Sequence, residues 1–161
     1  MSIKVGDKIP SVTLRHLNTE GGVNAVSADD YFKGKTVAVF GLPGAYTRTC
    51  SSRHLPGYVA NSDALKAKGI DEIACVSVND AFVMNAWGKE HNAAGKVTML
   101  GDGSCELTEA LGLTVDRVAA GMGIRSQRYS MVVKDGVVTE LNVEPSGEYG
   151  VSSAEAMLQR R

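Results

Sequence analysis

The sequence TVAVFGLPGAYTRTCSSRHL, residues 36–55, decides the fold of this chain. Its first part, residues 36–40, is short, β-branched and aromatic, and it lies between two glycines, which is typical of a buried strand. Residues 41–44 contain Gly and Pro and interrupt that strand. We expect a helix to begin next, with Thr47 or Thr49 as its N-cap, so that Cys50 falls near its first turn.

Cys50 is the candidate nucleophile of this segment. The first turn of a helix presents unpaired N–H groups and the positive end of the helix dipole, and both favour a thiolate. A thiolate at a junction of strand, loop and helix can act as a nucleophile, whereas a thiol that is only buried behaves as a small apolar side chain. Placement alone leaves both interpretations of Cys50 open.

The residues around Cys50 resemble those of the peroxiredoxin family. Residues 43–51, PGAYTRTCS, fit the family signature Pro-x-x-x-Thr-x-x-Cys. Longer matches to the peroxiredoxin 5 (type II) subfamily follow in order: HLPGY (54–58), LKAKG (65–69), VNDAFV (78–83), WG (87–88), RYSMVV (128–133) and LNVEP (141–145). The resemblance runs from about Val5 to about Pro145. It implies a thioredoxin-like fold and a thiol-dependent peroxidase, an antioxidant oxidoreductase that serves cell redox homeostasis.

Reduction of a peroxide needs a thiolate sulfur and donors that stabilise the charge growing on the leaving oxygen. Thr47, three residues before Cys50, lies on the same face of a helical turn, and its hydroxyl can bind the peroxide. Pro43 has a fixed φ and no N–H, so it can shape and dry the pocket. A cation is also needed, and Arg suits that role because it is always charged. The candidates are Arg48, Arg53, Arg117, Arg125 and Arg128.

The residues alone do not choose among these arginines, but the resemblance implies that Arg128, just before YSM (129–131), is the catalytic one. Arg125 can assist it. The expected catalytic set is therefore Cys50, Thr47, Pro43 and Arg128. Many relatives have proline where this chain has Arg48, and the extra positive charge near the pocket could attract an anionic reductant.

The other two cysteines bear on turnover. Attack on a peroxide converts Cys50 to a sulfenic acid, which a second thiol must reduce. Some relatives carry a resolving cysteine near the C-terminus, but residues 148–153, EYGVSS, contain none. Cys75 lies within an apolar run and Cys105 follows a glycine-containing turn, so we expect inert packing for the first and an incidental thiol for the second.

We therefore expect a one-cysteine cycle acting on hydrogen peroxide and small alkyl hydroperoxides, with the resolving thiol supplied from outside. By similarity to bacterial and plant relatives, glutathione with glutaredoxin is the expected reductant and thioredoxin the second choice. No metal ligand spacing and no phosphate-binding or dinucleotide-binding glycine motif occurs, so no metal or organic cofactor is expected.

Two other functions remain open. The protein could be a redox sensor or relay, in which oxidised Cys50 passes the signal to a partner and is recycled slowly. It could also be a thiol hydrolase, because His54 lies four residues after Cys50 on one helical face. We favour a helix-surface or supporting role for His54, since no third group that would orient it is evident.

Length and charge limit the remaining choices. The chain has 161 residues, which fits a single domain, 1–161. Its formal net charge is −1 with both signs interspersed, so nucleic acids and anionic membranes are poor partner candidates. No apolar run has the length of a membrane span, and the N-terminal residues resemble neither a signal peptide nor a transit peptide. We expect a cytoplasmic protein.

The order of the expected elements predicts an α/β fold: a central mixed sheet flanked by helices, with an extra N-terminal β-hairpin built from residues 8–17 and 23–26. Pro56 predicts a kink or a break in the helical segment. Residues 116–127 read as a loop, whereas residues 129–134 and 137–143 predict a hairpin around Asp135-Gly136. Residues 152–159 predict a terminal helix capped by Ser152 or Ser153. The resemblance also implies a homodimer, to which Leu42, Tyr46, Phe82 and Val83 could contribute.

Overall fold

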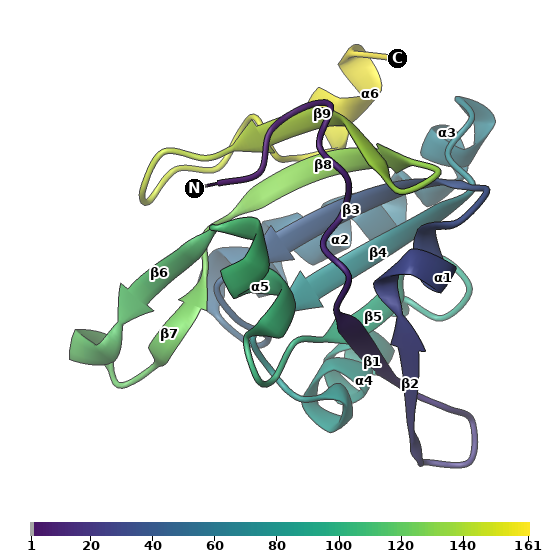
Figure 1. Ribbon diagram of the computed structural model, residues 1–161. Coiled ribbons are helices and arrows are strands. Elements are labelled where there is room, and N and C mark those ends of the chain that lie inside the picture. Colours follow the sequence, from purple (N-terminus) through teal and green to yellow (C-terminus); the bar gives the residue numbers. More distant parts are fainter. Residues whose placement is uncertain (1) are drawn as a thin grey trace.

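A seven-stranded mixed sheet forms the centre of the computed structural model, which describes residues 2–161 (Figure 1). Its strand order is β2-β1-β5-β4-β3-β8-β9. The strands β3, β4 and β5 run parallel to one another, and every other neighbouring pair is antiparallel. The bounds are β1 (Thr13–Leu17), β2 (Val23–Ser27), β3 (Thr36–Leu42), β4 (Glu72–Ser77), β5 (Thr98–Gly101), β8 (Tyr129–Lys134) and β9 (Val137–Val143).

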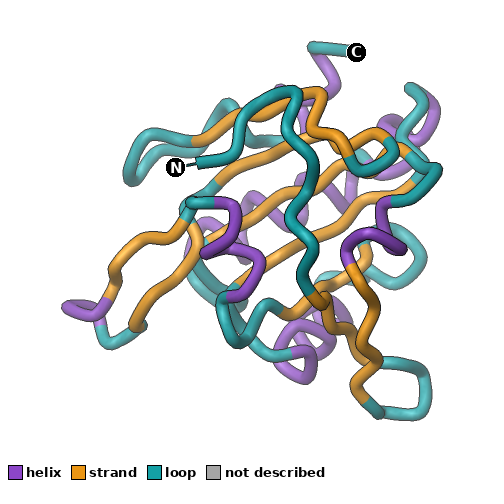
Figure 2. Tube along the Cα trace, viewed as in Figure 1, coloured by secondary structure: helices purple, strands orange, loops and turns teal. Residues whose placement is uncertain are grey.

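The two central strands are apolar over nearly their whole length because both of their faces are covered. In β3 every residue after Thr36 is buried, and in β4 every residue after Glu72 is buried. The covering helices form two sets. The helices α1 (Ala28–Phe32) and α5 (Glu106–Leu111) contribute to one core, and α2 (Leu55–Ala60), α3 (Ser62–Ala67), α4 (Ala81–Glu90) and α6 (Ala154–Gln159) contribute to the other. Figure 2 shows the helices on both sides of the strands. The predicted mixed sheet with flanking helices is therefore confirmed.

Side-chain caps define several helix starts. The Ser27 hydroxyl accepts a hydrogen bond from the Asp30 N–H at the start of α1, and the Asp80 carboxylate accepts one from the Val83 N–H at the start of α4. For α6, the cap is Ser153, which accepts from the Ala156 N–H. The N-terminal hairpin of β1 and β2 and the terminal helix α6 are both present where the sequence predicts them.

The prediction of a loop at residues 116–127 is wrong. The chain there forms a two-stranded antiparallel hairpin of β6 (Thr114–Arg117) and β7 (Gly123–Ser126), joined by the short 3-10 helix η2 (Val118–Ala120). Gly121 and Gly123 adopt φ of +75° and +68°, so these glycines form the turn of an ordered hairpin and not an irregular loop. Figure 1 shows this hairpin extending away from the seven-stranded sheet.

The helical segment that follows the catalytic loop is irregular. It starts at Arg48, passes through the π-helical turn η1 (Cys50–His54) and continues as α2. Pro56 occupies the first turn of α2, where its missing N–H costs least, so the irregularity lies just before the proline rather than at it. A second break at Asn61 separates α2 from α3.

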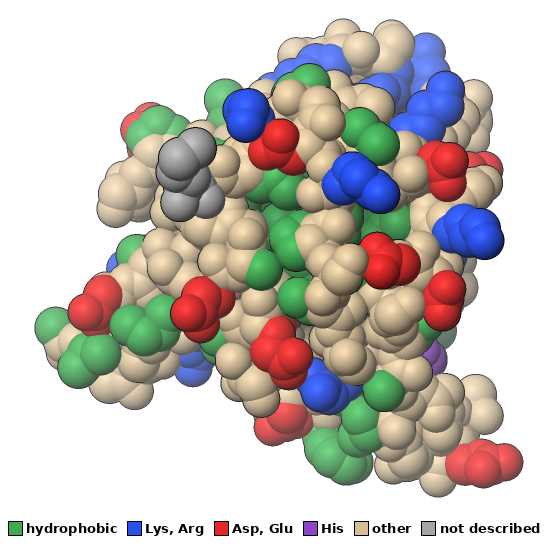
Figure 3. All heavy atoms as spheres, in the orientation of Figure 1, with side chains coloured by type: hydrophobic (Ala, Val, Ile, Leu, Met, Phe, Trp, Pro, Cys, Tyr) green, Lys and Arg blue, Asp and Glu red, His purple; other side chains and the backbone are tan. Residues whose placement is uncertain are grey.

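Three further observations concern the surface, membrane crossing and metal binding. On the face that Figure 3 shows, Lys and Arg (blue) and Asp and Glu (red) side chains both occur. No helix within residues 2–161 has the length and apolar character that a membrane crossing requires. In the same range, no group of three or more His, Cys, Asp or Glu side chains is placed to hold a metal ion.

Candidate active site

The pairing of β3 with β8 brings the predicted arginine to the predicted cysteine. Gly41, near the end of β3, faces Tyr129, the first residue of β8. A Cβ atom on Gly41 would lie 2.1 Å from the Tyr129 ring, so only glycine permits this close pairing. Arg128 directly precedes Tyr129 and therefore lies beside the loop that leaves β3.

Arg128 contacts the sulfur of Cys50. The Nη2 atom of Arg128 lies 3.2 Å from Cys50 Sγ and donates a hydrogen bond to it. Cys50 itself is fully buried. A guanidinium forms a stronger hydrogen bond with a charged acceptor than with a neutral one. The structure thus brings together two of the predicted residues, Cys50 and Arg128.

His54 holds the other end of the same guanidinium. Its Nδ1 lies 2.9 Å from Arg128 Nη1, and its Nε2 lies 3.1 Å from the carbonyl oxygen of Ser152. A carbonyl only accepts and a guanidinium only donates, so Nε2 carries the proton and Nδ1 accepts from Arg128. Burial, reinforced by the charge of Arg128, lowers the pKa of His54 to about 3, and the ring stays neutral. The expectation of a surface position for His54 is wrong, and the expectation of a supporting position is correct.

Glu144 fixes the loop that supplies the Ser152 carbonyl. Its Oε2 accepts hydrogen bonds from the Gly150 N–H at 2.6 Å, the Ser152 N–H at 2.9 Å and the Ser152 hydroxyl at 2.7 Å. Burial alone would raise the pKa of Glu144, but these bonds outweigh it and the pKa is lowered. The Tyr58 hydroxyl donates to the same Ser152 carbonyl at 2.8 Å. The sequence offered Ser152 only as a candidate helix cap and gave Glu144 no role, because the contact of the Ser152 carbonyl with His54 joins residues 98 positions apart.

Thr47 and Pro43 lie on the loop between β3 and the helix. The Thr47 hydroxyl donates to the Gly44 carbonyl at 2.7 Å, so its oxygen remains available as an acceptor. Thr49 lies inside the helix, which starts at Arg48, and its side chain makes no capping bond. Arg125 donates to the Pro43 carbonyl at 3.1 Å, and a Cβ on Gly44 would lie 2.5 Å from the same guanidinium nitrogen. Arg125 therefore holds the loop.

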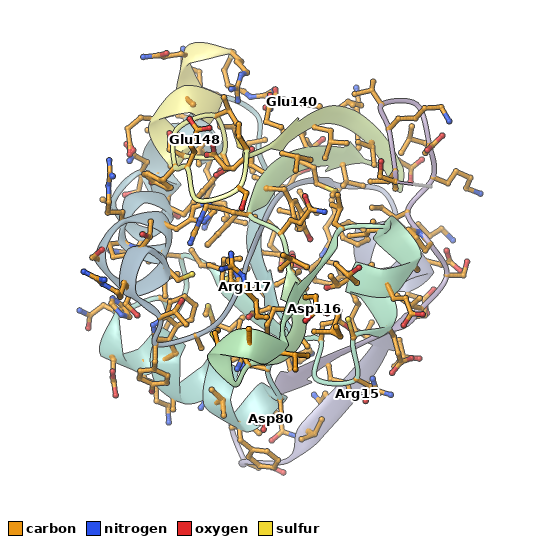
Figure 4. The ribbon with its side chains drawn as sticks, turned by 90° about the vertical axis from the view of Figure 1, so that its left-hand side faces the viewer. Arg15, Asp80, Asp116, Arg117, Glu140 and Glu148 are labelled. Atoms are coloured by element: carbon orange, nitrogen blue, oxygen red, sulfur yellow. The ribbon has the colours of Figure 1, made fainter. Side chains whose placement is uncertain are left out.

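An open cavity of about 730 Å³, here called the active-site groove, lies over these residues. Three of the predicted catalytic residues line it, Pro43, Thr47 and Arg128, together with residues of the β6–β7 hairpin and of the loop 144–149. Figure 4 looks onto this side of the molecule and labels Arg117 of the hairpin and Glu148 of the loop. A second cavity of about 530 Å³, near the start of α4, contains none of the predicted catalytic residues.

The other two cysteines lie apart from the groove. Cys75 is fully buried in β4, and burial raises the pKa of its thiol, with a smaller contribution from Cys50. Cys105 is partly exposed and adopts φ of +61°, and burial and the nearby Asp102 raise its pKa. All three cysteines are free thiols.

Comparison with known proteins finds relatives of similar sequence and similar fold. Residues 4–158 match the family model Redoxin. The chain is 46% identical over 157 residues to Peroxiredoxin-2D of Arabidopsis thaliana, which covers 98% of this chain and 97% of that protein. It is 49% identical to the crystal structure of reduced Prx3 from Vibrio vulnificus in complex with H2O2, with a TM-score of 0.94 and 98% of both chains covered. Peroxiredoxin 5 from Alvinella pompejana is 34% identical, with a TM-score of 0.85 and 99% of both chains covered.

Proposed function

Because these similarities extend over almost the entire sequence, the chain belongs to the peroxiredoxin family, and we propose that Cys50 is its peroxidatic cysteine. The fold is the thioredoxin-like fold of that family, and the chain is of the type II, peroxiredoxin 5-like kind. The protein is therefore a thiol peroxidase that reduces peroxides through a cysteine.

The chemistry at Cys50 is a two-electron transfer. The thiolate sulfur attacks one oxygen of the hydroperoxide, an S–O bond forms and the O–O bond breaks. The sulfur is oxidised to a sulfenic acid, and the leaving oxygen takes up a proton and departs as water or an alcohol. Arg128 donates to the sulfur and is close enough to stabilise negative charge on the oxygens as the bond breaks.

Thr47 and Pro43 complete the proposed site. The Thr47 proton is engaged by the Gly44 carbonyl, so the Thr47 oxygen is left to accept a hydrogen bond from the peroxide and orient it. Pro43 lines the groove without an N–H of its own, so it excludes water without competing for the peroxide.

The observation that carries this proposal is the bond of 3.2 Å from Arg128 Nη2 to Cys50 Sγ, with the guanidinium held by His54 on its other side. The test is consumption of hydrogen peroxide by the wild type, Cys50→Ser and Arg128→Gln. Loss of activity in the first variant and a large decrease in the second support the proposal. Full activity in Cys50→Ser would overturn it.

We propose that reduction of the sulfenic acid follows a one-cysteine cycle. Cys75 is fully buried within a central strand, and Cys105 lies outside the groove, so neither thiol is free to reach Cys50 without a change of structure. An external thiol is then required. We propose glutathione with glutaredoxin as the reductant and thioredoxin as the alternative, and no metal or organic cofactor.

The geometry discriminates against one of the two rival functions, the thiol hydrolase, but not against the redox sensor. A thiol hydrolase needs His54 to accept the proton of Cys50, but Nδ1 of His54 faces Arg128 and the lowered pKa makes the ring a weak base. A sensor role shares the first oxidation step with a peroxidase. Slow recycling by every thiol system tested would favour the sensor.

We further propose that residues 1–161 form a single domain, since both core clusters pack on one sheet. The three free cysteines support a reducing compartment, for which we propose the cytoplasm. A homodimer remains a proposal, with Tyr46 and Phe82 as contacts because they are 48% and 56% exposed. Leu42 is fully buried within the chain, so its predicted contribution to such an interface is wrong.

A further inference from the structure

The active-site groove carries two cations that the mechanism above does not use. Arg48 is exposed, Arg117 is half-buried, and both line the groove. Within residues 2–161 neither side chain forms an ion pair or a hydrogen bond, and the Nε of Arg117 is buried without a partner. Unpaired guanidinium groups in a partly enclosed cavity favour an anionic ligand.

The acidic residues of the groove do not cancel this charge. Glu144 already accepts three hydrogen bonds from Gly150 and Ser152, so its carboxylate is committed to the loop. Glu148 is exposed and lies on the other loop of the groove, and Figure 4 shows it well separated in this view from Arg117. An anion can therefore approach the arginines.

The groove also has an apolar part, and it is larger than hydrogen peroxide requires. Its volume of about 730 Å³ is that of a pocket for a medium-sized organic molecule. The apolar part of its lining comes from the catalytic loop, the hairpin and the loop that follows β9, namely Pro43, Tyr46, Val115, Met122 and Pro145.

The burial of Cys50 distinguishes a peroxide from a thiol as the occupant. In this conformation the sulfur is fully buried and accepts a hydrogen bond from Arg128, and the Thr47 hydroxyl donates to the Gly44 carbonyl, which leaves its oxygen available as an acceptor. A narrow hydroperoxide group can enter where a bulky thiol cannot align with the sulfur. We therefore assign a peroxide, and not a reducing thiol, as the occupant of the groove in this conformation.

We propose that the preferred substrate is an organic hydroperoxide with an apolar body and a carboxylate, and that Arg48 and Arg117 bind the carboxylate while the apolar lining holds the body. This inference rests on the proposed peroxidase function of Cys50. The reaction is balanced as for any hydroperoxide: Cys50 thiolate takes the terminal oxygen and becomes the sulfenic acid, the O–O bond breaks, and the alkoxide takes a proton from water to leave as the alcohol.

The test compares linoleic acid hydroperoxide with its methyl ester, both below the concentration at which they form micelles. The rate constant for oxidation of Cys50 is measured by stopped-flow fluorescence of Trp87, the single tryptophan, whose Nε1 donates to Ser51 Oγ at 3.0 Å beside Cys50. The readout is the ratio of the acid to the ester rate constant within each protein, which cancels any change in the reactivity of Cys50 itself. The proteins are the wild type, Arg48→Gln, Arg117→Gln, the double variant and Lys68→Gln, an exposed cation outside the groove.

The proposal predicts that the ratio of the acid to the ester rate constant is about ten or more in the wild type and in Lys68→Gln. In the double variant and in high salt the ratio should fall toward one. A ratio near one in the wild type, or a high ratio that survives both substitutions, would overturn it. If the substitutions slow only the reduction of the sulfenic acid by glutathione, the groove binds the reductant and the proposal is wrong. Absence of any Cys50 oxidation by hydrogen peroxide would instead reject the peroxidase function itself.

Discussion

Arg128 spans the distance between His54 and Cys50, with Nη1 at 2.9 Å from His54 Nδ1 and Nη2 at 3.2 Å from Cys50 Sγ. The two bonds fix the plane of the guanidinium, so the nitrogen that faces the sulfur is held in place before any peroxide arrives. Preorganised donors of this kind are the main source of electrostatic stabilisation in active sites. The neutral state of His54 is part of this arrangement, because a protonated ring would repel Arg128.

Replacement of Arg128 tests the donor to the sulfur. Arg128→Gln should lower the second-order rate constant of Cys50 oxidation by about a hundredfold, because the charge and the donor geometry are both lost. The rate constant of Arg128→Lys should lie between those of the wild type and Arg128→Gln. An ammonium keeps the charge but cannot bond to His54 and Cys50 in one plane as the guanidinium does. The measurement is stopped-flow oxidation by hydrogen peroxide. Arg53→Gln is the control, because Arg53 stacks on Tyr149 at 4.5 Å and has no bond to the sulfur.

Replacement of His54 tests its role as a positioning residue. His54→Ala leaves Arg128 Nη1 without its acceptor and should slow Cys50 oxidation by about tenfold. His54→Gln should recover most of that loss, since a carboxamide can accept from Arg128 and donate to the Ser152 carbonyl. Equal rates in the two variants would show that His54 contributes only packing.

The buried His54 also predicts a pH dependence of stability. Its pKa is about 3 in the folded protein against 6.5 in the unfolded chain, so only the unfolded chain binds the proton between those values. The contribution of the neutral His54 to the free energy of unfolding is fully present above pH 6.5. It is lost as the pH falls, by at most about 1.4 kcal/mol per pH unit.

Urea unfolding of the wild type and of His54→Gln at several pH values between about 4 and 7 measures this effect. The unfolding free energy of the wild type should fall more steeply with acid than that of the variant. Carboxylates such as Glu144, whose bonds are the same in both proteins, cancel in the difference. Parallel pH profiles would contradict a buried, neutral His54.

Thr47 is expected to act through its oxygen. Thr47→Ser keeps the hydroxyl, so its rate constant of Cys50 oxidation should stay within about threefold of the wild-type value. Thr47→Val keeps the shape of the side chain but lacks the hydroxyl, so its rate constant should be about a hundredfold lower. The comparison needs single-turnover kinetics, in which reduction of the sulfenic acid does not limit the rate. A rate in Thr47→Val equal to that in Thr47→Ser would remove the hydroxyl from the mechanism.

Local patterns predicted much of the fold. The central strands β3 and β4 are uninterrupted apolar runs, and the turn at Asp135-Gly136 has φ of +48° and +80°, as a type I′ turn requires. The hairpin of β6 and β7 was missed because its glycines also fit a loop. The π-helical turn at 50–54 has no recognised pattern in the sequence.

The site depended on contacts that no local pattern contains. The register of Gly41 opposite Tyr129 places Arg128 at the sulfur, and the sequence could name Arg128 only through its resemblance to a family. His54 looks like a surface residue on a helix until residues 149–153 are known to cover it. Leu42 was assigned to an interface for the same reason, since the burial of this last residue of β3 depends on segments that lie far away in the sequence.

The most direct test of the account is steady-state consumption of hydrogen peroxide with glutathione and glutaredoxin, and separately with thioredoxin. Three proteins are compared: the wild type, Cys50→Ser and the double variant Cys75→Ser/Cys105→Ser. We predict turnover with the glutathione system in the wild type and in the double variant, and none in Cys50→Ser. Turnover in Cys50→Ser, or its loss in the double variant, would contradict a one-cysteine cycle centred on Cys50.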